Sequence, residues 1–446
     1  MRIPQKPPSD EETQKIFAEI NDPKVIDEIK PYLQIVHSEY LHWDELPVDN
    51  RFKGVDLRRL WAFVRFNRDF NARAIPLNGL SLQYVQTASI EKALHDLDMR
   101  VGGQIKTDLD AKIPGNELRK KYLVNSLMEE AIASSQLEGA ATTRIAAKRM
   151  LRENRKPRNH SEQMILNNYQ TMRYIKEQAQ PNQILTIEFI QEIHKRITKD
   201  TMKDKSYEGS FRTDNEVKVY SIDDWKPIYE PPDYKLINPM LERLCNFANS
   251  EPAGFYLHPF VKAIILHYLV GYIHPFNDGN GRTARALFYW YLIAQKSYDY
   301  MEYVAVSTAI KNAPAKYARA YLYSETDNND ITYFVRFNLR TIDTAVTSFE
   351  KYIDKTKEEN KKIFEAIRQN PKMNFRQADL ILSLSKSDQS ITIFEMRERY
   401  STTYQTARTD LFDLAKRGYL HKITRGKQFV FILDKEKCLG SHEIKT

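Results

Sequence analysis

Residues 258–295 constrain the fold of this chain more than any other segment of the sequence. Residues 258–273 are apolar nearly all the way round a helix, which predicts a helix buried on every side. Proline cannot continue a helix in good geometry, so Pro275 predicts that this helix ends at His274. A glycine-bearing loop follows, and a run of strong helix formers begins at Arg282. The segment therefore predicts two core helices joined by a short polar loop.

The rest of the chain also carries a helical pattern. Apolar residues recur at three- and four-residue spacing over long stretches, whereas alternating Val-rich runs are few. Hydrophobic residues make up 42% of the 446 residues and aromatic residues 11%, which excludes an intrinsically disordered chain. We predict a mainly α protein, long enough for two to four domains.

Charge and cysteine content indicate a compartment more clearly than a ligand. The formal net charge is +8, and residues 371–446 hold 14 Lys and Arg against 9 Asp and Glu, an excess of five. Cys245 and Cys438 supply neither a disulfide framework nor a zinc site, which is typical of a reducing compartment. The first residues lack the apolar stretch of a signal peptide, and the longest apolar segment is too short to span a membrane. We expect a cytoplasmic protein with no membrane partner.

The loop at residues 274–285, HPFNDGNGRTAR, gathers the groups that phosphoryl chemistry needs. A glycine-bearing loop that leads into a helix N-terminus presents unpaired N–H groups and the positive end of the helix dipole to an anion. Asp278 is a carboxylate suited to Mg²⁺, and Arg282 and Arg285 place guanidinium groups on adjacent turns of one helix face. An imidazole with a pKa of about 6.5 is mostly neutral near pH 7.5, so His274 can accept a proton from a hydroxyl.

These twelve residues match the signature HPFx(D/E)GNGRxxR at every defining position, and the chain resembles the Fic family on this basis. The resemblance implies that His274 is the general base and Asp278 the Mg²⁺ ligand. It also implies that Arg285 meets the terminal phosphate of the nucleotide. The ATP- and phosphate-binding residues implied in this way are Asn277, Gly279, Asn280, Gly281, Arg282 and Arg285.

The family reaction implied by the resemblance is attack of a Ser, Thr or Tyr hydroxyl on the α-phosphate of ATP, with pyrophosphate leaving. Most of the catalysis would then be positioning and charge neutralisation. The implied ligands are ATP and Mg²⁺, and the implied partner is a target protein with a hydroxyl side chain, the chain itself included. The sequence leaves open whether the chain forms a homodimer.

Residues 124–139 show a helical pattern that closes at Gly139. The end of this pattern resembles the family's inhibitory motif (S/T)xxxE(G/N), with Ser134, Glu138 and Gly139 in the required places. The resemblance implies that Glu138 pairs with Arg285 and occupies the room that the γ-phosphate of ATP needs. A Ser and a Glu at this spacing also occur on ordinary solvent-exposed helix faces. The inhibitory role is therefore inferred mainly from the position of the motif on the N-terminal side of the HPFx(D/E)GNGRxxR signature.

Two other functions are compatible with these residues. In some family members a glutamate placed like Glu138 positions water for the removal of AMP from a modified protein, so the chain could be a de-AMPylase. The chain could also be a DNA-binding regulator or toxin-like module with a nucleotide-sensing Fic core. An intact His274 argues against a pure sensor, because a sensor needs no base at that position.

The segment from Glu208 to Ser221 resembles the family's flap, a hairpin whose edge could hold the target segment by strand addition. The docking residues implied there are Val217, Lys218 and Val219. A short polar hairpin also serves as a plain connection. Elsewhere, His258 is expected to start a helix and His267 to be a hydrogen-bonded core residue, so neither is assigned to the site.

The tail differs in character from the rest of the chain. It predicts a helix over residues 376–386, a second helix opened by a capping box at 392–395, a third opened by a box at 402–405, and two strands at 419–424 and 428–433. That order resembles a winged helix-turn-helix. We therefore predict four domains: an N-terminal helical domain at 1–110, a helical Fic core with a small β-hairpin flap at 111–345, a linker helix at 346–370, and a winged helix-turn-helix at 371–446.

A winged helix binds either DNA or a protein. The side chains that would face DNA from the third helix and the wing are Tyr404, Gln405, Arg408, Thr409, Arg425 and Lys427. Asp410 and Asp413 lie on the same helix and argue against DNA binding.

Overall fold

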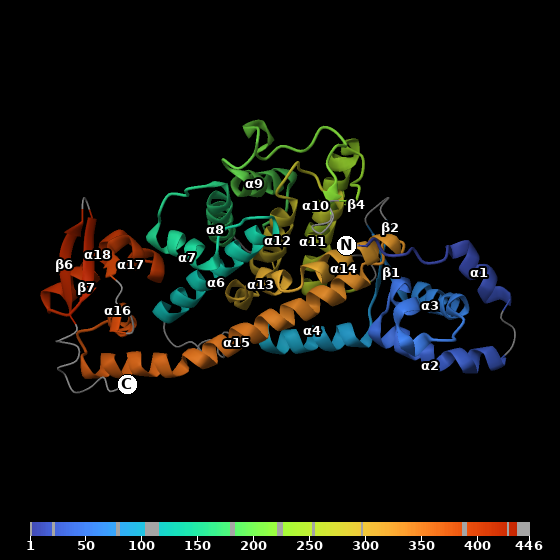
Figure 1. Ribbon diagram of the computed structural model, residues 1–446, viewed down its shortest axis with the longest axis horizontal. Helices are drawn as coiled ribbons and strands as arrows, with labels where there is room; N and C mark the ends of the chain where they lie inside the picture. Colours follow the sequence, from blue (N-terminus) through green and yellow to red (C-terminus); the bar gives the residue numbers. More distant parts are fainter. Residues whose placement is uncertain are drawn as a thin grey trace. The chain divides into compact units, whose positions relative to one another are not determined.

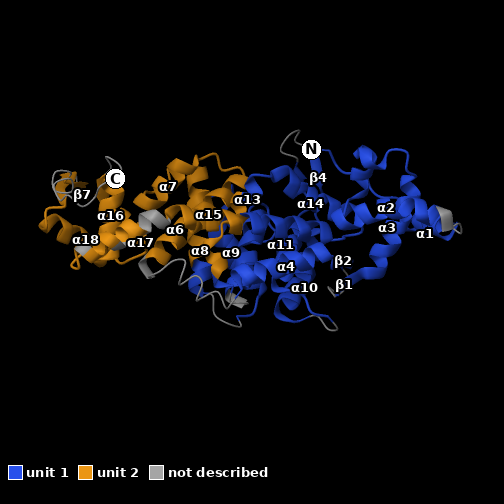
Figure 2. Ribbon diagram, turned by 90° about the horizontal axis from the view of Figure 1, so that it is seen from below, with its two compact units in different colours: residues 1–102, 174–299, 309–344 blue, residues 103–173, 300–308, 345–446 orange. Residues whose placement is uncertain are grey.

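The computed structural model describes the chain apart from residues 1, 20–22, 77–80, 103–115, 179–182, 221–225, 252–254, 296–297, 386–389, 426–427 and 435–446. Lys427 of the predicted wing and Cys438 lie outside the described residues. The chain divides into two compact units, each built from three separate stretches of sequence (Figure 2). Unit 1 comprises residues 1–102, 174–299 and 309–344, and unit 2 comprises residues 103–173, 300–308 and 345–446.

The N-terminal part of unit 1 is helical with one β-hairpin (Figure 1). Buried apolar residues between α2 and α3, among them Trp61 and Val36, form its hydrophobic core. The described elements here are α1 (Asp10–Glu19), α2 (Pro23–Glu39), η1 (Trp43–Val48), η2 (Asn50–Phe52), α3 (Leu57–Asn71), β1 (Ala72–Pro76), β2 (Ser81–Val85) and α4 (Ala88–Val101).

The β1–β2 hairpin is not expected from the sequence, which predicts helices and turns over this region. The two strands pair antiparallel from Ala72↔Val85 to Pro76↔Ser81. On the edge of β2 that faces away from β1, the backbone of Gln83 is hydrogen-bonded to a segment more than 200 residues away. Gln83 N–H donates to the Asn329 carbonyl at 3.1 Å, and Ile331 N–H donates to the Gln83 carbonyl at 2.9 Å. Because the strand is stabilised by a partner distant in the sequence, its own residues show no local pattern that predicts it.

The rest of unit 1 is arranged around α11, which packs against α10 and α12 (Figure 1). Its residues are buried on all faces, as the sequence predicts. Among the described residues, no helix is both long and apolar enough to cross a membrane. The elements are α9 (Ile187–Thr198), η4 (Lys205–Tyr207), β3 (Val219–Tyr220), β4 (Pro227–Tyr229), η5 (Tyr234–Leu236), α10 (Ile237–Asn249), α11 (Pro259–Ile273), α12 (Asn280–Trp290), a π-helical turn (Tyr291–Gln295) and α14 (Pro314–Thr326). Residues 300–308, which contain most of η7 (Asp299–Tyr303) and the first half of α13 (Val306–Lys311), belong to unit 2.

Unit 2 contains the helices α6 (Asn116–Leu137) and α7 (Arg144–Glu153) and the first part of α8 (His160–Gln178). The predicted linker helix is the second half of a longer helix, α15 (Thr332–Gln369), which has 38 residues. Its amphipathic pattern continues without Gly or Pro across the predicted boundary at residue 346, so nothing in the sequence stops the helix there.

The C-terminal part of unit 2 contains α16 (Phe375–Ser385), β5 (Ser390–Thr392), α17 (Ile393–Tyr400), α18 (Tyr404–Lys416), β6 (Leu420–Arg425) and β7 (Gln428–Leu433). The strands form an antiparallel sheet in the order β5-β7-β6, packed on one buried cluster with the helices. The capping box at Thr392 and Glu395 is present. The box predicted at 402–405 is wrong, because Thr403 caps α18 by accepting from Thr406 N–H. The three-residue strand β5 was too short to predict.

Candidate active site

His274 is the C-cap of α11, where the sequence places it. Its backbone N–H donates to the carbonyl of Val270 at 3.0 Å, and its φ of 48° is left-handed, which ends the helix. The ring Nδ1 lies 3.1 Å from the carbonyl oxygen of Gly271. A carbonyl oxygen only accepts, so in the neutral ring Nδ1 carries the proton and Nε2 carries the lone pair. Nε2 is therefore the atom that can take a proton from a hydroxyl.

The side chain of Asn280 closes the loop after His274. Phe276 N–H donates to Asn280 Oδ1 at 3.0 Å, and Asn280 Nδ2 donates to the Phe276 carbonyl at 2.8 Å. Asn280 is buried, so these hydrogen bonds are protected from water. The predicted phosphate ligand is thus also the clamp that shapes the loop. Asn277 lies half-buried between the two ends of this clamp.

The helix α12 begins at Asn280, two residues before the predicted start at Arg282. Its N-cap is Gly279, which has φ 80°, and no side chain caps this end within the described residues. The N–H groups of the first turn, including that of Gly281, have no acceptor within the helix, and the helix dipole adds positive potential there. This end of α12 has the geometry of an anion site.

Gly279 cannot be replaced without strain, because its left-handed φ is combined with a close neighbour. A Cβ at this position would lie 2.9 Å from Cγ2 of Thr198, on α9. The neighbouring His194 is a site residue that sequence reasoning missed. Its Nδ1 accepts from Gly209 N–H at 3.0 Å, so its Nε2–H donates to the Asp278 carbonyl at 2.8 Å. Nothing in the α9 sequence distinguishes this histidine from any other helix residue.

The same histidine stacks on the loop and stays neutral. The rings of His194 and Phe276 are parallel, with centroids 3.6 Å apart. Burial lowers the pKa of His194 to about 4. A neutral ring with fixed donor and acceptor atoms holds the carbonyl of Asp278 in one place.

The cationic side chains of α12 are buried. Arg282 is fully buried, its Nη1 donates to the Ile197 carbonyl at 3.3 Å, and its Nη2 lies 3.4 Å from Asp278 Oδ2. Arg285 is also buried. Burial and, secondarily, the charge of Arg285 lower the pKa of His267 to about 3.

Asp278 fits the Mg²⁺ ligand predicted from the sequence. The side chain of Asp278 is 51% exposed beside the start of α12. In the described part of the chain, no group of three or more His, Cys, Asp or Glu is arranged to hold a metal ion. Mg²⁺ needs no such group, since it is commonly bound through one or two carboxylates plus the phosphates of the substrate.

Arg212 connects the catalytic loop to the segment predicted as the flap. Its Nε donates to the carbonyl of His274 at 3.0 Å, and its backbone N–H donates to the carbonyl of Pro275 at 2.9 Å. Its remaining guanidinium nitrogens donate to the carbonyls of Asp214, at 2.8 Å, and Pro232. One buried side chain therefore links the backbone of His274 to the segment predicted as the flap. The sequence does not single out this arginine, because most of its partners are backbone carbonyls, with Asn215 Oδ1 as a further acceptor at 3.1 Å.

Residues 184–292, which contain this loop and Arg212, match the sequence model of the Fic/DOC family. This segment is therefore similar to a Fic/DOC domain. The loop after His274 and the helices α11 and α12 around it lie within this matched segment.

Curated relatives of the chain carry the name protein adenylyltransferase Fic. The protein of that name from Nematostella vectensis is 25% identical over 301 residues, which cover 64% of this chain and 62% of the relative. The protein from Drosophila persimilis is 28% identical over 217 residues, covering 49% and 40%. The matched part of the chain thus spans less than two thirds of these relatives.

A solved structure shares the fold. A Fic family protein from Desulfovibrio desulfuricans matches 79% of this chain and 98% of its own length, with a TM-score of 0.50 at 17% identity. The chain therefore has a mainly helical Fic fold with small two- and three-stranded antiparallel sheets.

The segment predicted as the flap contains a short antiparallel pair. Val219 in β3 pairs with Tyr229 in β4, while Val217 and Lys218 precede β3. Lys218 Nζ lies 2.7 Å from Glu230 Oε1. The hydroxyl of Tyr229 donates to the carbonyl of Tyr272 at 2.7 Å, which anchors the hairpin near the end of α11.

The segment that resembles the inhibitory motif ends α6 in unit 2. Ala140 N–H donates to the Ser135 carbonyl at 3.0 Å, Gly139 N–H donates to the Gln136 carbonyl at 3.2 Å, and Gly139 has φ 91°. This pair of hydrogen bonds is a Schellman motif with Glu138 as the C-cap. The helix closes at Gly139, as predicted. Ser134 is buried and Glu138 half-buried.

The exposed face of α18 carries the predicted DNA-facing residues Tyr404, Gln405, Arg408 and Thr409. Asp410 lies on the opposite, buried side, 2.6 Å from Arg376 Nε. Asp413 accepts from Gln377 at 2.8 Å. Asp410 is therefore not on the exposed face, so the objection that the sequence raised against DNA binding at this position does not apply. Arg425 ends β6.

The two histidines excluded from the site have structural roles, as expected. His258 caps α11 by accepting from Phe260 N–H at 3.2 Å. His267 is buried with Nε2 2.8 Å from the Tyr317 hydroxyl.

Proposed function

We propose that the chain is a protein adenylyltransferase that moves AMP from ATP onto a Ser, Thr or Tyr hydroxyl of a target protein. The observation that carries the proposal is the hydrogen bond from His274 Nδ1 to the Gly271 carbonyl, which leaves Nε2 as the proton acceptor beside the start of α12. The Fic/DOC match and the names of the curated relatives support AMP as the transferred group.

In the proposed reaction His274 Nε2 accepts the proton of the hydroxyl as a bond forms to the α-phosphorus and the bond to pyrophosphate breaks. General-base catalysis of this kind contributes about 10² to 10⁴-fold. Arg282, Arg285 and the N–H groups at the start of α12 bind phosphate oxygens. Asp278 would hold Mg²⁺, which neutralises phosphate charge when bound. Arg212 keeps the His274 backbone and the flap in fixed relation.

We infer that Glu138 restrains this activity by pairing with Arg285 in place of the γ-phosphate. The Schellman turn supports this inference, because it holds the carboxylate at a defined helix end. Arg285 is a buried cation, and breaking a buried ion pair by removing one partner costs about 3 to 5 kcal/mol. A pair of that strength can compete with productive binding of ATP.

The test is transfer of label from [α-³²P]ATP with Mg²⁺ onto the protein and onto proteins of a cell extract. Wild type, Glu138→Gly, Glu138→Gln and His274→Ala are compared, with [γ-³²P]ATP as the control for kinase activity. We expect label from the α position only, more of it with both Glu138 variants, and none with His274→Ala. Label that persists in His274→Ala would refute the assigned base. Absence of transfer with loss of AMP from a modified protein would instead show a de-AMPylase.

We propose as a second function that the C-terminal elements bind duplex DNA, because four polar side chains share the exposed face of α18. Binding of the full chain to duplex DNA is measured at about 50 and 200 mM salt, where phosphate contacts predict a steep loss of affinity. Arg408→Ala should weaken binding, while Lys53→Ala should not. Equal binding by both variants would exclude this face.

A further inference from the structure

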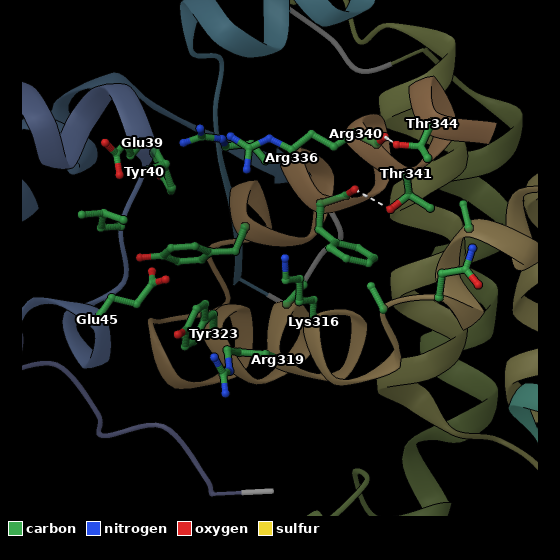
Figure 3. Close-up of a pocket in the computed structure, with 17 residues that line it drawn as sticks. Glu39, Tyr40, Glu45, Lys316, Arg319, Tyr323, Arg336, Arg340, Thr341 and Thr344 are labelled. Atoms are coloured by element: carbon green, nitrogen blue, oxygen red, sulfur yellow. Dashed lines mark hydrogen bonds between the residues drawn. The ribbon is translucent and has the colours of Figure 1, made fainter. Parts of the chain in front are cut away.

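A cavity of about 740 Å³ lies in unit 1, between the segment at residues 39–45 and the helices α14 and α15 (Figure 3). Four cationic side chains line it. Arg336 and Arg340 lie on α15 on one side, and Lys316 and Arg319 lie on α14 on the other. The volume falls in the range of about 300 to 1,000 Å³ that small-molecule sites occupy.

Arg336 is the buried member of this set, with a relative exposure of 7%. Its Nη2 donates to the carbonyl of Ser38 at 3.2 Å, and its guanidinium lies 5.6 Å from the ring centroid of Tyr40. Its Nη1 is buried and has no hydrogen-bond partner among the described residues. Burial lowers the pKa of Arg336 to about 10, with a smaller effect of Arg340, so it remains charged at neutral pH. A buried, charged donor without a partner is costly unless a ligand completes it.

The neighbouring buried arginines Arg65 and Arg68 each also have a buried Nε without a hydrogen-bond partner among the described residues, but unlike Arg336 both lie beside a carboxylate. Arg65 Nη1 lies 2.8 Å from Asp327 Oδ1. Arg68 Nη1 donates to the Tyr333 hydroxyl at 2.5 Å and lies 3.5 Å from Asp327 Oδ2. Arg65 and Arg68 thus each form an ion pair with Asp327, whereas no ion pair between Arg336 and a carboxylate is present among the described residues.

The acidic residues that line the cavity have other partners. Glu39 pairs with Arg51 at 2.6 Å, and Glu45 Oε2 accepts from the N–H of His42 at 2.8 Å. In the described part of the chain, none of the four cations forms an ion pair with a carboxylate. The four cations outnumber the two carboxylates of the lining, so the cavity keeps an excess of positive charge even though Glu45 and Arg319 attract each other.

We propose that this cavity is a second anion site, which binds a phosphate-bearing small molecule through Arg336, Arg340, Lys316 and Arg319. Arg336 supplies a buried positive charge in the wall of the cavity, and the other three cations supply charge at the more open side. The rings of Tyr323 and Phe337, which also line the cavity, cover the organic part of the ligand. The site uses none of the residues of the catalytic loop, and it does not depend on the proposed transferase activity.

The first test is binding of inorganic phosphate, pyrophosphate and AMP to the full-length protein by calorimetry. The double variant Lys316→Gln/Arg340→Gln changes two exposed side chains, and Lys53→Gln is the matched control in the same unit. We expect at least tenfold weaker binding, or one site fewer per chain, in the double variant and no change in the control. Binding to the catalytic loop contributes equally to all three proteins. Unchanged binding in the double variant would overturn the proposal.

The probes identify the source of the phosphate. Equal affinity for inorganic phosphate and AMP, lost in the double variant, would assign the site to the free ion. At least tenfold tighter binding of AMP, about 1.4 kcal/mol, would assign it to a nucleotide.

Arg336→Met provides a second readout, since it removes the unpaired charge while keeping most of the side-chain volume. We expect its melting temperature to equal or exceed that of wild type without ligand, and the rise of Tm caused by the preferred probe to disappear. A Tm that falls without ligand and still rises normally with the probe would contradict the proposal. AMP transfer measured in the same variants separates the two proposals, because it should stay at the wild-type rate.

Discussion

Arg212 makes its hydrogen bonds mainly to backbone carbonyls on two sides of the catalytic loop. A planar guanidinium reaches several acceptors at fixed angles, whereas a lysine ammonium on a flexible stem cannot reproduce that geometry. In the proposed reaction we therefore expect Arg212 to be a positioning residue, which acts through the backbone of His274 and not on the substrate.

We predict that Arg212→Lys lowers kcat for AMP transfer by about tenfold or more, because small displacements of a catalytic group are costly. The KM for ATP should change little, since Arg212 is not among the proposed phosphate ligands. Steady-state kinetics with Arg196→Lys, an exposed arginine of α9, as the control checks this. A rise in KM without a fall in kcat would contradict a positioning role.

Gly279→Ala should destabilise the protein more than Gly54→Ala. Both glycines have φ near 80°, so both substitutions meet the left-handed strain of about 1 to 2 kcal/mol. Only at Gly279 does the added Cβ approach a neighbour, Thr198 Cγ2, at 2.9 Å, whereas Gly54 has nothing within 4 Å. Urea unfolding of the two variants measures the difference, and equal losses would show that the loop adjusts freely.

At the scale of elements, α6 is held by α16 and α17 of its own unit. Lys121 of α6 lies 2.7 Å from Asp379 of α16, and the Tyr400 hydroxyl of α17 donates to Asp379 at 2.5 Å. Burial alone would raise the pKa of Asp379, but Lys121 and Arg399 lower it below its usual value. The helix α6, whose C-cap is Glu138, is therefore joined to the C-terminal elements by the ion pair between Lys121 and the buried Asp379.

Replacing Asp379 by Ala should cost about 3 to 5 kcal/mol of stability, because it leaves Lys121 and Arg399 without their buried partner. The companion double variant Asp379→Ala/Lys121→Met should recover part of this loss. Both are compared with wild type by denaturant unfolding of the full chain. Additive losses in the double variant would mean that the pair is not coupled.

At the scale of the whole molecule, the charge state of buried histidines sets the response to acid. Burial lowers the pKa of His37, His42 and His194 to about 4 and that of His267 to about 3. In the unfolded chain a histidine binds its proton near pH 6.5. Unfolding therefore takes up protons between about pH 6.5 and 4. Glu325 acts in the opposite sense, because burial raises its pKa to about 8.

We predict that the free energy of unfolding falls as the pH drops from 6.5 towards 4, with each buried histidine contributing about 1.4 kcal/mol per pH unit. His267→Gln should reduce this slope by about one proton, whereas His95→Gln, at an exposed position, should not. Urea unfolding between pH 4.5 and 7.5 measures both slopes. Identical slopes for wild type and His267→Gln would show that His267 takes up no proton on unfolding.

The sequence by itself determined the buried helix before His274, the loop that follows it and the helix stop at Gly139. These features depend on proline, on glycine and on apolar periodicity, which act within a few residues of chain. The boundaries were less accurate at the start of α15, where no breaker marks position 346, and at the start of α12, where Gly281 lies inside the first turn and not in the loop.

Only the tertiary structure decided the roles of His194 and Arg212, the hairpin β1–β2 and the cationic cavity. Each depends on partners far apart in the chain: His194 on Asp278, Gln83 on Asn329, and Arg336 on Ser38. Such contacts involve backbone groups or a shared cavity, and they produce no pattern of residue types in the sequence from which they could be predicted. Features that depend on adjacent residues can be predicted from the sequence, whereas contacts between residues far apart in the chain form only when the chain packs into its tertiary structure.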